Sequence, residues 1–241
     1  MLVIPCFNEE HRLDTSAFRS FALPGYDIHF LFVDDGSRDG TLRVLQSLRD
    51  QQPGRFEVLQ LERNSGKAEA VRRGVVAAIA DRPDFIGYWD ADLATPLEEL
   101  RGFLSVVEQR PGVAIVFAAR VRLLGRDISR RANRHYIGRV GATLISQTLR
   151  LAIYDTQCGA KLFRVDDTLG RVFERPFLSR WIFDVEIIAR YLKEWGRDRV
   201  AASLYEYPLD VWHDVKGSKV RGLDFLRALI DLWKIRRAYF H

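Results

Sequence analysis

Two carboxylates separated by one residue are the side chains of this sequence best suited to chemistry. Asp90 and Asp92 directly follow the apolar run 85–89, and an apolar run of that length is typical of a buried strand. Ligands of open α/β sheets bind just beyond the carboxyl ends of the strands. Two neighbouring acids there repel each other unless a cation or hydrogen-bonded ligand lies between them. Carboxylate oxygens favour Mg²⁺ or Mn²⁺. An isolated Asp-x-Asp motif is more often a polar turn, but this motif is accompanied by others.

Two further polar turns follow other apolar runs. Residues 34–37, Asp-Asp-Gly-Ser, come after the run 28–33, so the Asp35 carboxylate could accept hydrogen bonds from a nucleobase or ribose. Residues 64–67, Asn-Ser-Gly-Lys, end the next strand and begin a helix, where backbone N–H groups and Lys67 can face phosphate. Neither a Walker A loop nor a G-x-G-x-x-G fingerprint is present, so the pattern predicts a nucleotide site of another type.

The positive charge is concentrated in two segments. Residues 120–139 hold seven arginines against one acid, and residues 216–241 hold seven lysines and arginines against two acids. Such patches indicate a polyanionic or phosphate-bearing partner. The alternative for each segment is a helix face with solvated basic side chains.

Composition limits the class of protein. The 241 residues are 47% hydrophobic and 29% charged, values of an ordinary soluble protein with room for one large α/β domain or two small ones. Two cysteines, Cys6 and Cys158, are too few for a disulfide framework and favour a reducing cytosol. Cys158 is expected to be a small buried side chain. We expect no signal peptide, and no uncharged apolar run approaches the ~18 residues of a membrane-spanning helix.

Strand and helix patterns alternate in the first half of the chain, which predicts a largely parallel sheet with helices on both faces. Thr95-Pro96-Leu97-Glu98 has the pattern of a capping box. No linker is visible, so a single domain is expected over 1–241. The expected strands are 2–4, 28–33, 56–61, 85–89 and 113–118, and the expected helices include 67–80, 128–153, 181–195 and 222–239.

The helices expected at 128–153 and 222–239 combine apolar and basic side chains. Helices of this kind lie on anionic membranes and would admit a lipid phosphate. Packing of the apolar side into the core, with the arginines in solvent, is an equal alternative.

Taken in order, these motifs resemble the family 2 glycosyltransferases, which have the GT-A fold. The later motifs look like the branch that glycosylates polyprenyl phosphates, and the run D-T-Q-C-G is most similar to dolichyl-phosphate glucosyltransferases. The matching segments are 4–10, 33–41, 64–67, 90–92, 155–163, 183–186, 212–213 and 217–219.

The resemblance implies a role for each matching residue. A nucleotide-sugar-binding half, 1–118, would hold the donor, and an acceptor-binding half, 119–241, would end in a basic amphipathic helix. In the first half, the nucleotide pocket would be lined by Pro5, Phe7, Glu9, Lys67 and Ala91. Asp35 would contact base or ribose, Asp90 would hold ribose or sugar, and Asp92 would hold the metal. In the second half, Arg120 would face the acceptor phosphate with help from Arg131 and Arg134, Gln157 would contact substrate, and Ser218 and Lys219 would belong to a loop closing over the diphosphate.

Three departures from the family pattern are visible. Ala94 stands where mannosyl-type relatives often carry a glutamine that binds metal, and Phe7 stands where many relatives have tyrosine. We expect none of the C-terminal transmembrane helices that many relatives carry.

The expected activity is inverting, metal-dependent transfer of a hexose, glucose from UDP-glucose, to a polyprenyl phosphate at the cytoplasmic face of a membrane. A phosphate monoester has a second pKa of about 6, so it can attack without a general base. One alternative acts on a soluble or saccharide hydroxyl and uses Asp184 or Glu186 as base. A second is a non-enzymatic, basic nucleotide- or nucleic-acid-binding module, against which the acidic pairs argue. The expected partners include no nucleic acid, and the oligomeric state stays open.

Overall fold

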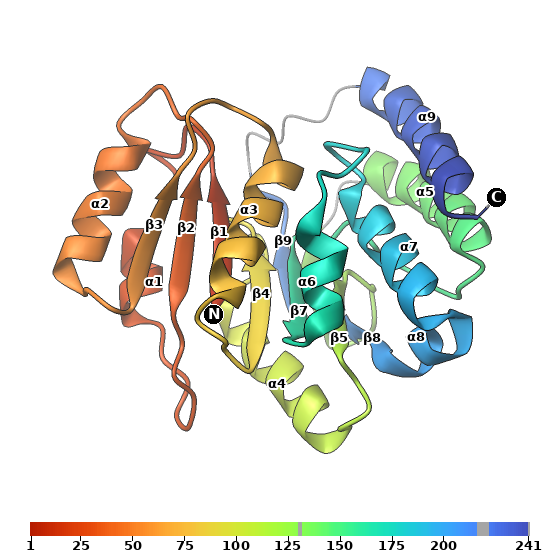
Figure 1. Cartoon of the computed structure of the whole chain (residues 1–241), viewed down its shortest axis with the longest axis horizontal. Helices are drawn as coiled ribbons and strands as arrows, with labels where there is room; N and C mark the ends of the chain where they lie inside the picture. The colour runs from red at the N-terminus through yellow and green to blue at the C-terminus, as the bar shows by residue number, and fades with distance from the viewer. Residues whose placement is uncertain (130–131, 216–221, 241) are drawn as a thin grey trace. The chain divides into compact units, whose positions relative to one another are not determined.

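The computed structural model describes residues 1–129, 132–215 and 222–240 (Figure 1). The chain forms two compact units. Unit 1 consists of Met1–Leu93 and Ala160–Pro176, and unit 2 of Ala94–Gly159 and Phe177–His241. The expected single domain with functional halves meeting after residue 118 stays a prediction.

Unit 1 contains a mixed, mostly parallel sheet of order β3-β2-β1-β4-β7. Its first four strands run parallel, and β7 pairs antiparallel with β4. The expected sheet type is therefore confirmed, while β7 has no counterpart among the predicted strands. The strands are β1 (Leu2–Cys6), β2 (Phe30–Asp34), β3 (Phe56–Gln60), β4 (Phe85–Trp89) and β7 (Ala160–Arg164).

Helices cover both faces of this sheet, as expected. On one face, Phe18 of α1 packs edge-on against Phe30 and Phe32 of β2. On the other, α3 lies so close that a Cβ atom on Gly74 would be 2.3 Å from Cγ1 of Val3, so only glycine fits. The unit 1 helices are α1 (Thr15–Ser20), α2 (Thr41–Gln51), α3 (Lys67–Ile79) and α6 (Asp167–Glu174).

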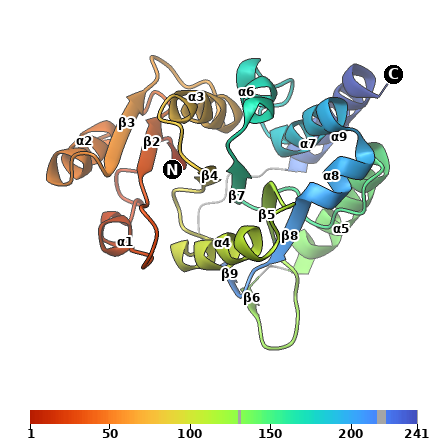
Figure 2. The ribbon, with the colours of Figure 1, turned by 60° about the horizontal axis from the view of Figure 1, so that its bottom comes forward.

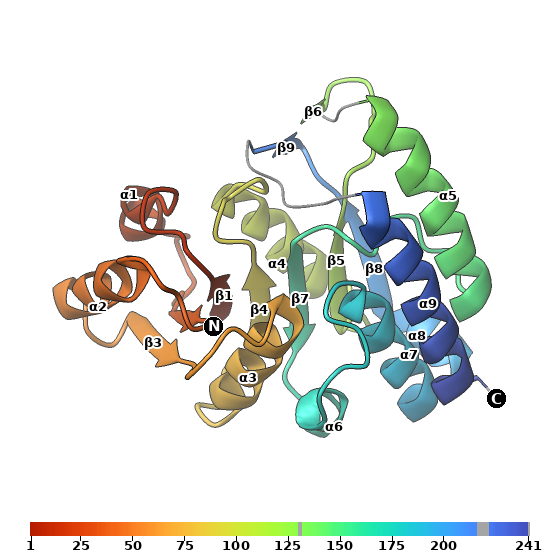
Figure 3. The same ribbon diagram turned by 90° about the horizontal axis from the view of Figure 1, so that it is seen from above.

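Unit 2 contains two parallel strand pairs, β5 with β8 and β6 with β9. Helix α7 packs against both α8 and α9, and α5 also contacts α9 (Figure 3). The strands are β5 (Ile115–Ala119), β6 (Asp127–Ser129), β8 (Leu204–Pro208) and β9 (Val211–His213). The helices are α4 (Leu100–Gln109), α5 (Ala132–Leu149), α7 (Phe183–Trp195), α8 (Arg197–Ser203) and α9 (Gly222–Tyr239), with a 3₁₀ turn at Leu97–Glu99 before α4.

Two predictions for unit 2 are wrong in detail. The helix expected from residue 128 begins at Ala132, because Ile128 pairs with β9 as part of β6. The expected N-cap at Thr95 is displaced by one residue, because Pro96 is the N-cap of a 3₁₀ turn that begins at Leu97. The Thr95 hydroxyl instead lies 3.6 Å from the sulfur of Cys158, which is buried as expected. Within the described ranges, no helix is long and apolar enough to cross a membrane.

Candidate active site

Residues 90–92, Asp-Ala-Asp, are called the acidic motif and form a tight turn at the carboxyl end of β4. The N–H of Leu93 donates to the carbonyl of Asp90 over 3.2 Å. Leu93 has a φ of 50°, a left-handed conformation that is uncommon for leucine. The side chains of Asp90 and Asp92 remain 33% and 30% exposed. The turn therefore presents both carboxylates to solvent at the end of the sheet where ligands bind.

Two basic side chains of unit 1 neutralise these carboxylates. The Lys67 ammonium forms an ion pair with Asp90 and lies 5.9 Å from the centre of the Tyr88 ring. A guanidinium nitrogen of Arg12 lies 3.8 Å from Asp92. The repulsion expected between the two acids is thus offset by cations from α3 and from the segment after β1.

Asp35 positions Lys67 by holding the start of α3. Its carboxylate accepts from the N–H groups of Ser65 and Gly66 over 2.7 and 2.8 Å. Gly66 has a φ of 94°, a conformation that favours glycine. These two N–H groups are therefore committed to Asp35 in this structure and not to phosphate. The expected contact of Asp35 with base or ribose stays a prediction.

The segments after β1 and β2 are tied together beside this turn. The N–H of Glu9 donates to the Thr41 hydroxyl over 2.7 Å, and the N–H of Arg38 donates to the Asn8 side chain over 2.9 Å. Pro5, Phe7 and Glu9 are half-buried, and Ala91 is buried. The donor residues expected in the first half of the chain thus all belong to unit 1, on segments at the carboxyl ends of its parallel strands or at the start of α3. Their individual roles stay predictions.

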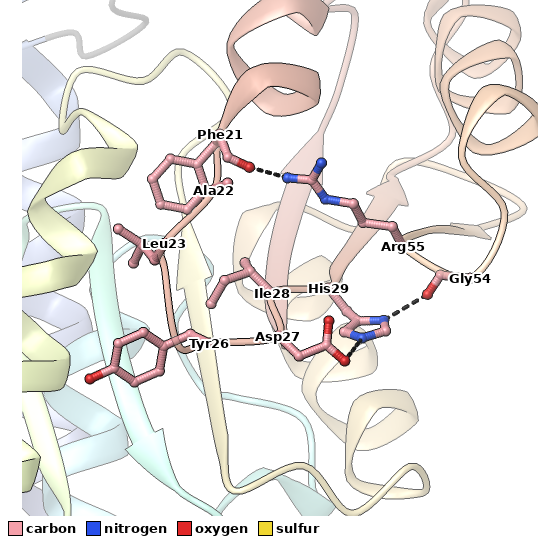
Figure 4. Close-up of a pocket in the computed structure, with 9 residues that line it drawn as sticks. All are labelled: Phe21, Ala22, Leu23, Tyr26, Asp27, Ile28, His29, Gly54 and Arg55. Carbon is pink, nitrogen blue, oxygen red and sulfur yellow. Dashed lines mark hydrogen bonds and ion pairs between the residues drawn. The ribbon is translucent and has the colours of Figure 1, made fainter.

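A cavity in unit 1 lies at the other end of the strands. It has a volume of about 260 Å³ and is lined by residues that precede β2 and β3 (Figure 4). His29 bonds Asp27 and the carbonyl of Gly54, while Arg55 donates to the carbonyl of Phe21. These polar groups hold the local backbone, and the lining contains no residue of the acidic motif.

The carboxylates of the acidic motif are suitable ligands for a divalent cation that also binds the substrate. Across the residues that the structure describes, no cluster of three or more His, Cys, Asp or Glu side chains could hold a metal. Mg²⁺ is usually bound in proteins by one or two carboxylates together with water and substrate phosphates. Asp90 and Asp92 could supply two carboxylates of this kind.

In unit 2, Arg120 is held by a carboxylate that sequence analysis did not assign. The two guanidinium nitrogens Nε and Nη2 lie 2.7 and 2.9 Å from the oxygens of Asp155. Both side chains are nearly buried, and the Trp212 ring lies against the guanidinium at 5.2 Å. The expected contact of Arg120 with acceptor phosphate stays a prediction. Arg120 would make this contact while it remains paired with Asp155. The only sequence signal for Asp155 was its place in the D-T-Q-C-G run.

Glu206 of β8 in turn positions Asp155. Its carboxylate accepts from the N–H groups of Tyr154 and Asp155 over 2.8 and 2.7 Å. Burial raises the pKa of Glu206, and the nearby charge of Asp155 raises it further. Gln157 joins this group through its N–H, 3.0 Å from the Asp155 carboxylate. Glu206 lies in no recognisable motif, so no sequence signal identifies it.

The two residues proposed as general bases for a hydroxyl acceptor are buried in α7. Glu186 accepts from the N–H of Leu178, the guanidinium of Arg190 and the hydroxyl of Tyr239 over 2.7 to 2.8 Å. Its side chain is 0% exposed. Glu186 therefore holds the packing of α7 and α9 and is not accessible to a sugar hydroxyl.

Four of the residues expected to bind acceptor or diphosphate have no described side chain. Arg131, Ser218 and Lys219 lie outside the described residues, and Arg134 belongs to α5 without a described side chain.

Comparisons with known proteins agree on one family. The sequence model of glycosyl transferase family 2 matches residues 1–169. A dolichyl-phosphate beta-glucosyltransferase of Dictyostelium discoideum is 29% identical over 260 residues, covering 98% of this chain and 76% of that protein. The enzyme of the same name from Saccharomyces cerevisiae is 30% identical over 259 residues, covering 99% and 74%.

A solved structure has the same fold. Glucosyl-3-phosphoglycerate synthase from Mycobacterium tuberculosis, crystallised with Mn²⁺, UDP-glucose and phosphoglyceric acid, matches with a TM-score of 0.66 and 15% identity. The match covers 98% of this chain and 79% of that one; at this identity it shows the fold alone. The predicted GT-A fold is confirmed, and the chain belongs to glycosyl transferase family 2.

Proposed function

We propose that this protein transfers glucose from UDP-glucose to a polyprenyl phosphate, with inversion, at the cytoplasmic face of a membrane. Relatives named dolichyl-phosphate beta-glucosyltransferases align with nearly the whole chain. The observation that carries the proposal is the turn in which Asp90 and Asp92 are both partly exposed and are paired with the basic side chains of Lys67 and Arg12. Such a turn can exchange its cations for a metal and a diphosphate.

The donor would bind to unit 1. Asp90 and Asp92 would hold a divalent cation, Mg²⁺ or Mn²⁺, which would neutralise charge on the leaving diphosphate. Lys67 lies beside them at the first residue of α3, where an ammonium group and the helix N-terminus both favour a phosphate. Pro5, Phe7 and Glu9 would line the nucleotide pocket.

The acceptor would react without a general base. A lipid phosphate is largely dianionic at neutral pH and can attack the anomeric carbon directly. The protein then has to position this anion and neutralise its charge. Arg120 would contact the phosphate while Asp155 and Glu206 fix its guanidinium, and Arg131 and Arg134 would assist. Ser218 and Lys219 would belong to a loop that closes over the diphosphate.

Transfer of radiolabelled glucose from UDP-glucose to a polyprenyl phosphate, with and without Mn²⁺, tests the proposal. We expect metal-dependent, base-stable glycolipid with wild-type protein and none with Asp92→Asn. The matched control is Asp81→Asn, which removes an exposed acid at the end of α3 and should leave transfer unchanged. Full activity of Asp92→Asn, or transfer only to soluble hydroxyl acceptors, would contradict the proposal. Thermal shifts with UDP- and GDP-sugars would identify the donor independently.

A further inference from the structure

We propose that the turn Leu123–Arg126, between β5 and β6, inserts Leu123 and Leu124 into a lipid bilayer and so brings unit 2 to its acceptor. The inference rests on the proposed function, since only a lipid acceptor requires it. In Figure 2 this connection projects past β6 and β9. The proposed membrane-binding surface consists of the two leucines and the arginines beside them.

The two leucines are presented to solvent next to each other. Leu124 is 105% exposed and Leu123 is 49% exposed. Single exposed apolar residues are common on protein surfaces, but two adjacent leucines at the tip of a turn form a small apolar patch. Such patches indicate a contact with a membrane or another molecule.

The turn is ordered, so the exposure of the leucines is built into the fold. The N–H of Arg126 donates to the carbonyl of Leu123 over 3.2 Å, and Gly125 has a φ of 83°. These are the features of a type II turn, with Leu124 at position i+1 and Gly125 at position i+2. A Cβ atom on Gly125 would meet nothing within 4 Å, so the tip stands clear of the described part of the chain.

The flanks of the turn are fixed to unit 2. The guanidinium of Arg126 donates to the carbonyl of Pro208 over 2.8 Å and pairs with Asp210. The Nε of Arg122 donates to the carbonyl of Ile128 over 3.3 Å. Strand β6 then pairs with β9. The backbone on both sides of the leucines is therefore held in place, which lowers the conformational entropy lost when the leucines insert.

A bilayer fits this surface better than a protein partner. Arg122 directly precedes the leucines and donates to a backbone carbonyl, and basic residues beside apolar ones favour anionic headgroups. A stable protein interface buries roughly 800 Å² per partner, far more than two leucines offer. Arg120 lies three residues before Leu123, so insertion of the leucines would bring the end of β5, which carries Arg120, towards the lipid headgroups.

Vesicle binding of the full-length protein tests the inference directly. Wild type, the double variant Leu123→Ser/Leu124→Ser and a control would be sedimented with phosphatidylcholine vesicles containing phosphatidylserine. The control is Val76→Ser, which removes an exposed apolar residue of α3 in unit 1. Partial burial of two leucines supports a loss of at least about tenfold in vesicle affinity for the double variant. Val76→Ser should change it less than about twofold, the scale of an ordinary surface substitution.

A second measurement separates this inference from the proposed function. With a short, water-soluble polyprenyl phosphate and no membrane, the double variant should transfer glucose as fast as wild type. With a long-chain acceptor in vesicles, it should be slower by about tenfold, in step with its lost affinity. Absence of transfer by wild type in both assays would refute the proposed function, whereas vesicle binding would still report on the turn.

Two outcomes would overturn the inference. One is vesicle binding by the double variant that equals that of wild type. The other is a change in oligomeric state, measured by sedimentation velocity, without a change in vesicle binding, which would assign the turn to a contact between protein chains.

Discussion

Replacing Lys67 with methionine should tighten the binding of Mn²⁺ when no nucleotide is present. In the structure the Lys67 ammonium pairs with Asp90, the carboxylate that we propose shares a metal with Asp92. A divalent cation must displace this ammonium or bind beside it. The same substitution should weaken UDP-glucose binding, because the displaced lysine would otherwise contact the diphosphate.

The size of the effect follows from the charges. Two unit charges about 4 Å apart interact by about 1 kcal/mol in water and about 4 kcal/mol at an effective dielectric constant of 20. A divalent cation doubles these values. Lys67 is 40% exposed and can turn away from an arriving metal, so the lower end applies. We therefore expect Mn²⁺ to bind Lys67→Met about thirtyfold more tightly, a difference of about 2 kcal/mol.

Mn²⁺ titration followed by electron paramagnetic resonance measures this affinity without any turnover. Arg73→Met is the matched control, because it removes a cation from the same helix that pairs with Glu69 at 2.8 Å. Its Mn²⁺ affinity should equal that of wild type, and Lys67→Arg should keep the weak binding. Equal or weaker Mn²⁺ binding by Lys67→Met would refute the reasoning.

Three further predictions concern unit 2. Asp155→Asn leaves the buried guanidinium of Arg120 uncompensated and should lower the free energy of unfolding by about 3–5 kcal/mol, as measured by urea denaturation; a loss below about 1 kcal/mol, the range of a surface pair, would contradict this. The pKa of Glu206 is higher in the folded state than in the unfolded state, so the folded protein binds more protons at this residue. Glu206 therefore reduces the free energy of unfolding as the pH rises from its unfolded pKa through its folded pKa. Glu206→Gln should therefore lose less stability than wild type as the pH rises above 4.5. An equal loss of stability in the two proteins, measured by urea denaturation, would argue against that role. Glu186→Gln should lower the melting temperature but keep the transfer rate per folded molecule, whereas loss of transfer by a fully folded variant would favour the hydroxyl-acceptor mechanism.

The parallel strands of unit 1 were predictable because burial on both faces requires continuous apolar runs. Strand β4 has the predicted bounds, and β1, β2 and β3 differ by a few residues at their ends. Strand β7 was missed because Lys161 interrupts its apolar sequence. That lysine is fully buried, with its ammonium 4.9 Å from the centre of the Tyr88 ring on the neighbouring strand. An aromatic partner of this kind cannot be read from local sequence.

The acids at the strand ends were also predictable, but their partners were not. Asp90 and Asp92 stand out because charges directly follow an apolar run. The pairing of Arg120 with Asp155 joins residues 35 positions apart, and Glu206 reaches Tyr154 across 52 positions. These contacts depend on how β8 pairs with β5, which neither periodicity nor spacing specifies.

The late position of β7 in the chain affects how the protein can be synthesised. Strand β4 leaves the ribosome about seventy residues before the strand that covers its open edge. An uncovered edge of this length invites pairing with other chains. Nascent chains halted before residue 160 should therefore aggregate or recruit chaperones, and an expressed fragment ending at residue 118 should be insoluble even though it contains every acid of the donor site.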